Sequence, residues 1–421
     1  MFFCFIQIAV SMMAYYHYYK NRIRYFTVIT AIYFLSYFVA GSYDVPLTVY
    51  FIMVVLGIGI PRNIQLFEWI IYISLTVYSV IGILFQDVFL TLSSLITRYG
   101  YILIYFLLFS AKWSKRCWRI KKSDFHFMVR LGLLTEFLIV GLVWIQDGLG
   151  SRIVTNHQPI GAGIVIGLAV IIGWCYYTKR FSSSEMLIYS LITVVIVIMS
   201  GTRGYMVMIA LPLLIILMMY LLDIHGNGEK QPGRMGVFLI LVIVAVVFIW
   251  IMGMGEEVIQ LLRLDKGLGY RENENAFVKG IMKNAPWYHQ LFGFGLGGGA
   301  SHIDGFLNIV EEASWNRSFM YDRLLTGTIF HNYWYTILFK QGIIGLIMVI
   351  AFFGKMIKDV YQLKTDLWIS AMLYTMILGS AVSLTFRVTA TCSIYETMMI
   401  AVLMNIIRRS TKRENKGEKK R

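Results

Sequence analysis

The sequence carries little charge for its length. Of 421 residues, 14% are charged and 58% are hydrophobic, and the mean hydropathy is +0.67. Soluble domains have about 25% charged residues and about 45–50% apolar residues. This shortage of charge excludes a water-soluble globule and a disordered chain. It predicts an all-α polytopic membrane protein.

Acidic residues, prolines and cysteines are also few. There are 23 Asp and Glu against 38 Lys and Arg, but the basic residues cluster between apolar runs. That pattern is typical of membrane orientation and not of nucleic-acid binding. Six prolines exclude a proline-rich linker architecture. The four cysteines show no CxxC or metal-type spacing, so neither a zinc site nor a structural disulfide is expected.

Apolar runs of about 20 residues, the length that crosses a bilayer, follow one another along the chain. They predict thirteen spans, or twelve if the short run between Pro46 and Pro61 is not one. No basic stretch precedes the first run, which predicts a retained span and not a cleaved signal peptide. The predicted spans are 1–18, 25–41, 45–60, 66–86, 89–111, 127–147, 159–177, 184–200, 205–222, 236–253, 333–354, 367–385 and 391–407.

The strongly basic short connections all fall on one side of this topology, which is predicted to be the cytoplasm. They include residues 112–122 and the basic tail at 408–421. The N-terminus and the long loop at 254–332 are then outside. We expect residues 1–421 to form a single membrane domain. The loop is too short to bury a core alone, so it is predicted to cap a cavity at the outer face.

Three polar stretches near the predicted outer face are candidate sites, because polar groups are costly near hydrocarbon. Arg203 lies in a short turn between Gly201 and Gly204, where a guanidinium and approachable backbone amides suit a phosphate. The alternative for Arg203 is an interface anchor. His331 opens an amphipathic run, and its alternative is an interfacial hydrogen-bonding residue. Arg271 begins a helix-like stretch that is followed by a glycine-rich segment at 291–299. No strand precedes that segment and no Gly-Lys-Thr follows it, so it does not predict a nucleotide site.

Taken together, these stretches resemble the bacterial O-antigen ligase and O-antigen polymerase (Wzy) superfamily of membrane glycosyltransferases. The resemblance covers about residues 150–350. Its four parts occur in the same order as in that family. They are Asn156-His-Gln-Pro159, Ser200-Gly-Thr-Arg203-Gly204, Arg271 with a helix and Pro286 … Phe292-Gly-Phe-Gly295, and His331-Asn332 with ten residues between His331 and Gly342.

The resemblance implies a metal-independent glycosyltransferase of the bacterial cytoplasmic membrane that acts on undecaprenyl-diphosphate-linked oligosaccharides. Arg203 and Arg271 would stabilise the diphosphate, and His331 would take or orient the proton of the attacking sugar hydroxyl. The further substrate-binding candidates are Arg323, Arg152, Arg98 and Asn332. No cofactor, metal or nucleic acid is expected. Membrane lipid and a chain-length regulator protein are the expected further partners.

Arg98, in the fifth predicted span, raises a separate question. Glu136 lies in the antiparallel sixth span, and both residues fall roughly 12–17 Å from the outer face. An unpaired charge at that depth costs several kcal/mol. We therefore predict a contact between Arg98 and Glu136. The alternative is that Arg98 lines the cavity for the lipid carrier.

Three functions fit the sequence. The first is a polymerase that joins repeat units into O-antigen or capsule, and the second is a ligase that moves a finished glycan to a lipid or protein acceptor. The third, of another class, is a carrier-lipid flippase or other transporter. The long outer loop with its arginines and histidine argues against transport. Polymerase is preferred over ligase because of the breadth of the family, since no residue separates the two.

Overall fold

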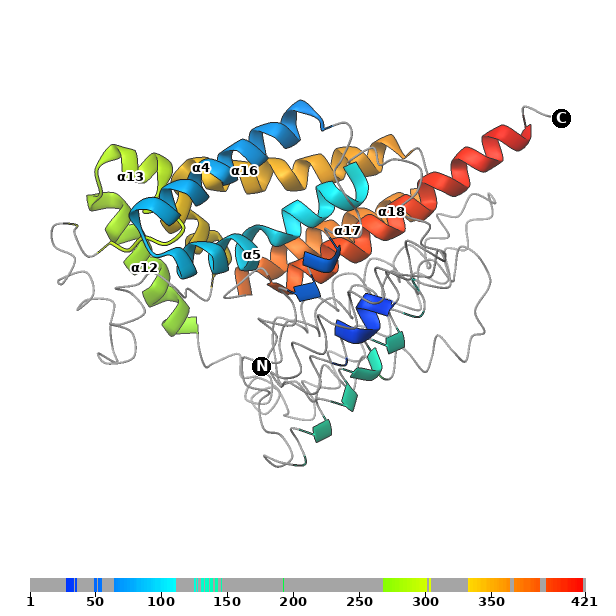
Figure 1. Cartoon of the computed structure of the whole chain (residues 1–421), viewed down its shortest axis with the longest axis horizontal. Helices are drawn as coiled ribbons and strands as arrows, with labels where there is room; N and C mark the ends of the chain where they lie inside the picture. The colour runs from blue at the N-terminus through cyan, green and yellow to red at the C-terminus, as the bar shows by residue number, and fades with distance from the viewer. Residues whose placement is uncertain are drawn as a thin grey trace, which may run out of the picture. The chain divides into compact units, whose positions relative to one another are not determined.

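The structure is a computed structural model in which residues 64–110, 268–300, 332–363, 367–386 and 391–418 are described. Residues 192 and 303 and scattered residues between 28 and 54 and between 125 and 145 are described as well. Helices dominate these residues, and no strand occurs among them (Figure 1). Three of the described helices are long and apolar enough to cross a membrane. The prediction of a helical membrane protein is confirmed to that extent.

The chain divides into two compact units, residues 1–202 with 390–421 and residues 203–389. In the first unit, α4 (Leu66–Phe85) and α5 (Val88–Tyr105) form a helical hairpin, and a π-helical turn, η1 (Phe106–Ser110), extends α5. The turn is tight because the Asp87 side chain caps α5 by accepting the N–H of Leu90 at 2.7 Å. The predicted spans 66–86 and 89–111 match these helices.

The last helix, α18 (Thr391–Glu418), packs against α5. Asn405 donates from Nδ2 to the carbonyl of Leu108, and Arg408 donates to the carbonyl of Phe109 at 3.5 Å. These pairs are 297 and 299 residues apart. The nearly constant separation means that the two helices are parallel (Figure 1). This is the relative direction that the predicted topology requires of the fifth and thirteenth spans.

α18 is buried on all sides over its middle turns, because every residue from Met398 to Met404 is at most 1% exposed. The helix also continues to Glu418, well past the end of the predicted span at 407. Most of the predicted basic tail is therefore helical. Lys, Arg and Glu are good helix formers, so an apolar helix can extend into such a sequence.

The second unit contains α12 (Leu268–Asn284), α13 (Trp287–Phe292), α16 (Tyr333–Gln362), α17 (Leu367–Ser383) and a 3-10 turn, η3 (Leu384–Phe386). α16 is not continuous. Gly342, at φ 64° and ψ −159°, breaks it. The break frees the carbonyls of Phe339 and Lys340, which accept the N–H groups of Phe294 and Gly295, each at 2.9 Å. The glycine-rich turn is therefore bonded to the break.

Two glycines make this contact possible. Gly293 and Gly342 both have positive φ, at 72° and 64°. A Cβ on Gly293 would overlap the backbone of Lys340 and Gln341, and one on Gly342 would overlap the carbonyls of Gln290 and Leu291. The two backbones are thus closer than any side chain would allow.

We expect Gly342→Ala to lower the melting temperature and the yield of folded protein. The φ and ψ of Gly342 are in a region that essentially only glycine adopts, which costs an alanine about 1–3 kcal/mol, and the overlap with Leu291 adds to that cost. Gly354→Ala is the matched control in the same helix, because nothing lies within 4 Å of its added Cβ. That variant should gain up to about 1 kcal/mol of helix propensity. Thermal denaturation in detergent measures both, and equal melting temperatures would contradict the role of the break.

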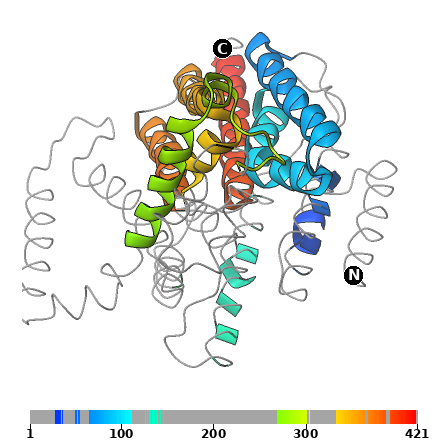
Figure 2. The ribbon, with the colours of Figure 1, turned by 90° about the vertical axis from the view of Figure 1, so that its left-hand side faces the viewer.

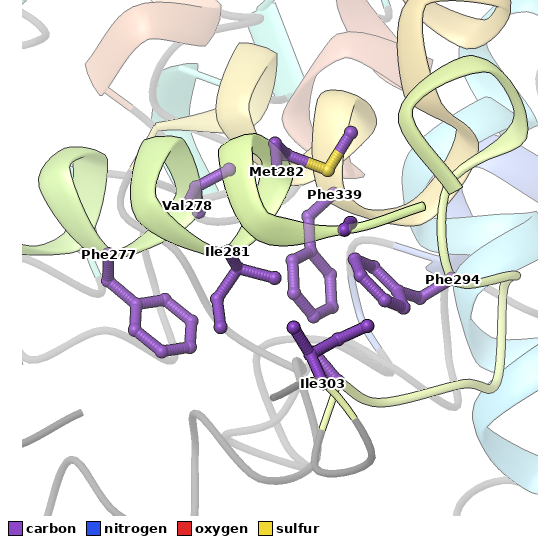
Figure 3. Close-up of a cluster of buried hydrophobic side chains, with 9 residues drawn as sticks. Phe277, Val278, Ile281, Met282, Phe294, Ile303 and Phe339 are labelled. Carbon is purple, nitrogen blue, oxygen red and sulfur yellow. The ribbon is translucent and has the colours of Figure 1, made fainter. Parts of the chain in front are cut away.

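Nine buried residues, eight of them from outside α16, form a hydrophobic cluster that we call the cap cluster (Figure 3). All but one come from the predicted outer loop 254–332, and Phe339 is the contribution of α16. The loop thus shares a core with α16, in line with its being too short to bury one alone. The members are Phe277, Val278, Ile281, Met282, Ala285, Phe294, Ala300, Ile303 and Phe339.

Candidate functional site

The structure describes three of the seven predicted site residues. Asn332 and Arg98 are described in full, and for Arg271 the backbone is placed in α12. Within the described ranges, no group of His, Cys, Asp and Glu is arranged to hold a metal ion. The predicted residues outside the described ones are His331, Arg203, Arg323, Arg152 and the proposed ion-pair partner Glu136.

Asn332 is the N-cap of α16 and is buried. Its Oδ1 accepts the N–H of Trp334 at 3.1 Å, and its backbone carbonyl accepts the Thr336 hydroxyl at 3.2 Å. An asparagine at this position satisfies one of the amide groups that a helix start leaves without partners. Because Oδ1 is engaged in capping, Nδ2 is the side-chain group through which Asn332 could contact a substrate.

α12 runs beside the first part of α16 and in the same direction (Figure 2). Lys279 Nζ lies 5.8 Å from the centre of the Tyr335 ring. About one turn further along both helices, Ile281 and Met282 join Phe339 in the cap cluster (Figure 3). The residues of α12 that are one turn before Lys279 therefore lie beside the first residues of α16. Arg271 is two turns before Lys279, at the end of α12 that is nearer to Asn332.

Two polar residues at this end of α12 were not predicted. Glu274 is 1% exposed, and it precedes Phe277 and Val278 of the cap cluster by one turn. Asn275 has a buried Oδ1 that accepts no hydrogen bond. A signal for Glu274 was present in the sequence, because the spacing 274, 277, 278, 281 and 285 is one helix face. A single acid on an otherwise apolar face is a candidate for a site.

This junction combines amide groups, a buried carboxylate and aromatic rings. Trp334 and Tyr335 are half-buried beside it. Amides and carboxylates bind hydroxyl groups, and aromatic faces pack on the apolar faces of sugar rings. The start of a helix also carries a partial positive charge. The arrangement therefore suits a ligand that is rich in hydroxyl groups and has negative charge.

Arg98 lies in the other unit, where it is 4% exposed. The predicted partner, Glu136, is outside the described residues, but the packing of α18 on α5 supplies another acid. Contacting residues of α18 and of the extension of α5 are 297 and 299 positions apart in the sequence. Counting back along both helices by the same amount places Glu396 at the same depth as Arg98. Glu396 is fully buried. Opposite charges at one depth on two packed helices attract each other strongly, because the local dielectric is low.

We expect Arg98→Gln and Glu396→Gln each to destabilise the protein, and the double variant to lose less than the sum of both. Removing one member of a buried charge pair costs about 3–5 kcal/mol, and removing both leaves no uncompensated charge. Melting temperatures of the four proteins give the coupling. As a control, Arg98→Gln combined with Asp359→Asn, in the other unit, should be additive. Strict additivity of the first pair would contradict the coupling.

Comparison with the models of known protein families finds no match, and comparison with curated protein sequences finds none either. In the part of the chain that the structure describes, the protein is helical, with three helices long and apolar enough to cross a membrane and a polar junction where α12 meets the start of α16.

Proposed function

We propose that the protein polymerises undecaprenyl-diphosphate-linked oligosaccharide repeat units into a surface polysaccharide, at the outer face of the bacterial cytoplasmic membrane. The observation that carries this proposal is the parallel packing of α12 on the first part of α16. It brings the helix that contains Arg271 to the residue that follows His331 in the chain. The order of motifs that resembles the polymerase and ligase superfamily supports the same conclusion.

In the proposed reaction, His331 accepts the proton of an acceptor sugar hydroxyl, and the oxygen attacks the anomeric carbon of the donor. The bond between that carbon and the phosphate oxygen breaks, and undecaprenyl diphosphate leaves with the electron pair. Arg203 and Arg271 stabilise the negative charge that develops on the leaving group. Arg152 and Arg323 assist in binding it. His331 then returns its proton to solvent, and the transfer between donor and acceptor needs no oxidant or reductant.

The described residues contribute the frame of this site. Asn332 fixes the backbone directly after His331, since it caps α16. Glu274 follows Arg271 by three residues, a spacing at which a carboxylate can orient a guanidinium on one helix face. The buried Oδ1 of Asn275 offers an acceptor for a sugar hydroxyl. Each of these residues belongs to the start of α12 or to the start of α16.

Purified protein in liposomes tests the proposal. With synthetic undecaprenyl-diphosphate repeat units and without added metal, we expect a ladder of longer glycans on a gel and release of undecaprenyl diphosphate. A ligase would form product only when a lipid or protein acceptor is added. A flippase would move the substrate between leaflets without forming a glycosidic bond. Transport without a new bond would overturn the proposal.

A further inference from the structure

α16 is longer than a membrane span needs. Its 30 residues measure about 45 Å at 1.5 Å per residue, whereas the hydrocarbon core of a bilayer is about 30 Å thick. The break at Gly342 divides it into a short first part and a longer second part. A straight helix of this length would extend beyond the hydrocarbon, so the position of the break bears on which part of α16 crosses it.

The two parts differ in what they expose. Every described side chain from Tyr333 to Gln341 is buried or half-buried, largely against the cap. Beyond Gly342, an apolar stripe is open at helical spacing, with Ile343 43%, Ile347 59% and Ile350 56% exposed. Open isoleucines in such a row are typical of a lipid-facing surface. The lipid-facing part of α16 thus begins at the break.

Charged residues mark both limits of this stripe. Lys340, on the outer side of the break, is buried, and its Nζ donates to the carbonyl of Gly298 at 2.5 Å. At the other end Lys355 pairs with Asp359 at 2.5 Å, and Lys358 is exposed. From Gly342 to Lys358 the helix rises about 24 Å, and a lysine extends further by snorkelling. That length agrees with the thickness of the hydrocarbon.

α13 lies against the break, because a Cβ on Gly342 would overlap the carbonyls of Gln290 and Leu291. His289 holds the helix in place from inside. Its ring stacks on Phe294, with centroids 4.5 Å apart, and its Nδ1 lies 3.0 Å from the carbonyl oxygen of Gly293. The outer side of α13 carries three open aromatic rings, namely Trp287 (69% exposed), Tyr288 (47%) and Phe292 (47%).

We propose that the outer boundary of the membrane passes at Gly342 and that α13 is an interfacial anchor, with its three open rings among the lipid headgroups. Trp and Tyr favour this zone because one end of each ring is apolar and the other is polar. α12 and the cap cluster then stand above the bilayer in water. α13 packs against Gly342, where the lipid-facing stripe of α16 starts, so lipid is the partner that covers the rings. The proposal does not depend on the proposed glycosyl transfer.

Depth measurements by electron paramagnetic resonance test the boundary. A nitroxide is attached to single cysteines at Tyr288, Phe292, Ile350 and Ala276 in protein that lacks its four native cysteines and is reconstituted in liposomes. The label at position 350 should be accessible to dissolved oxygen and inaccessible to a water-soluble nickel chelate. The label at Ala276, which is exposed on α12, should show the reverse. Tyr288 and Phe292 should give a shallow depth, within about one helix turn of the phosphates.

Two results would overturn the proposal. If labels at Tyr288 and Phe292 are as accessible to oxygen and to the nickel chelate as the label at Ala276, α13 lies in water. If their accessibilities equal those of the label at Ile350, the membrane boundary lies further out than Gly342. A second measurement needs no label. The fluorescence of Trp287 is the difference between the emission of the native protein and that of Trp287→Phe. Lipids brominated near the headgroup should quench this fluorescence more strongly than lipids brominated near the chain end. Absence of this preference would also reject the anchor.

Discussion

Replacing His331 by glutamine is expected to abolish polymer formation while the repeat unit still binds and accumulates. Glutamine keeps hydrogen bonding but cannot accept a proton near neutral pH. Loss of a general base lowers a rate by about 10²–10⁴-fold. The rate of polymer formation in liposomes measures the effect. If His331 only orients the substrate, the glutamine variant should retain most of the activity, and near-native polymerisation would rule out proton transfer.

The native enzyme should also lose activity as the pH falls through the imidazole pKa, normally near 6.5, because the protonated ring cannot accept a proton. His289→Gln is the matched control. His289 is another histidine of the same unit and is engaged by Gly293 and Phe294, so its replacement should leave the acid limb of the pH profile in place. If the acid limb disappears in His289→Gln, the pH dependence arises from His289 and not from His331.

Replacing Arg271 or Arg203 by alanine is the second change with a large expected effect. Each variant loses one charge-assisted contact to the diphosphate leaving group, which costs about 2–4 kcal/mol, or roughly 30- to 1,000-fold in rate. Lysine should restore activity only in part, because it lacks the planar fork of donors. Polymer length on gels and initial rates provide the measurement.

Lys283→Ala is the control for general loss of positive charge from α12, since Lys283 is exposed in its last turn. It should polymerise at close to the native rate. Native chain length in Arg271→Ala or Arg203→Ala, with protein levels unchanged, would remove that arginine from the site.

The helical elements were predictable where composition alone determines them. α4 and α5 begin and end near the predicted residues, because a tight polar turn with a capping Asp87 separates two long apolar runs. The break in α16 was not predictable. Gly342 lies in an apolar run that tolerates glycine, and its positive φ depends on a contact with Leu291, about fifty residues earlier in the sequence. A local pattern carries no information about such a contact.

The site was predictable only as separate motifs. Arg271 and the stretch from His331 onward are predicted from their order in the chain, whereas the proximity of α12 to the start of α16 rests on the contact of Lys279 with Tyr335 and on the shared cap cluster. Glu274 was passed over because α12 is rich in polar residues, and its burial follows from packing against residues far away in sequence. The role of Asn332 as an N-cap also needed the backbone.

The position of α18 has a consequence for how the protein is made. The middle turns of this helix are fully buried in the first unit, yet the ribosome synthesises it after all the other described helices. At about 5–20 residues per second, α5 waits roughly 15–60 s for the helix that covers it. During that interval the buried face of α5, including Arg98, lies in the membrane without α18. A premature stop before residue 391 removes the buried helix that packs on α5, so even a late truncation leaves the first unit incomplete.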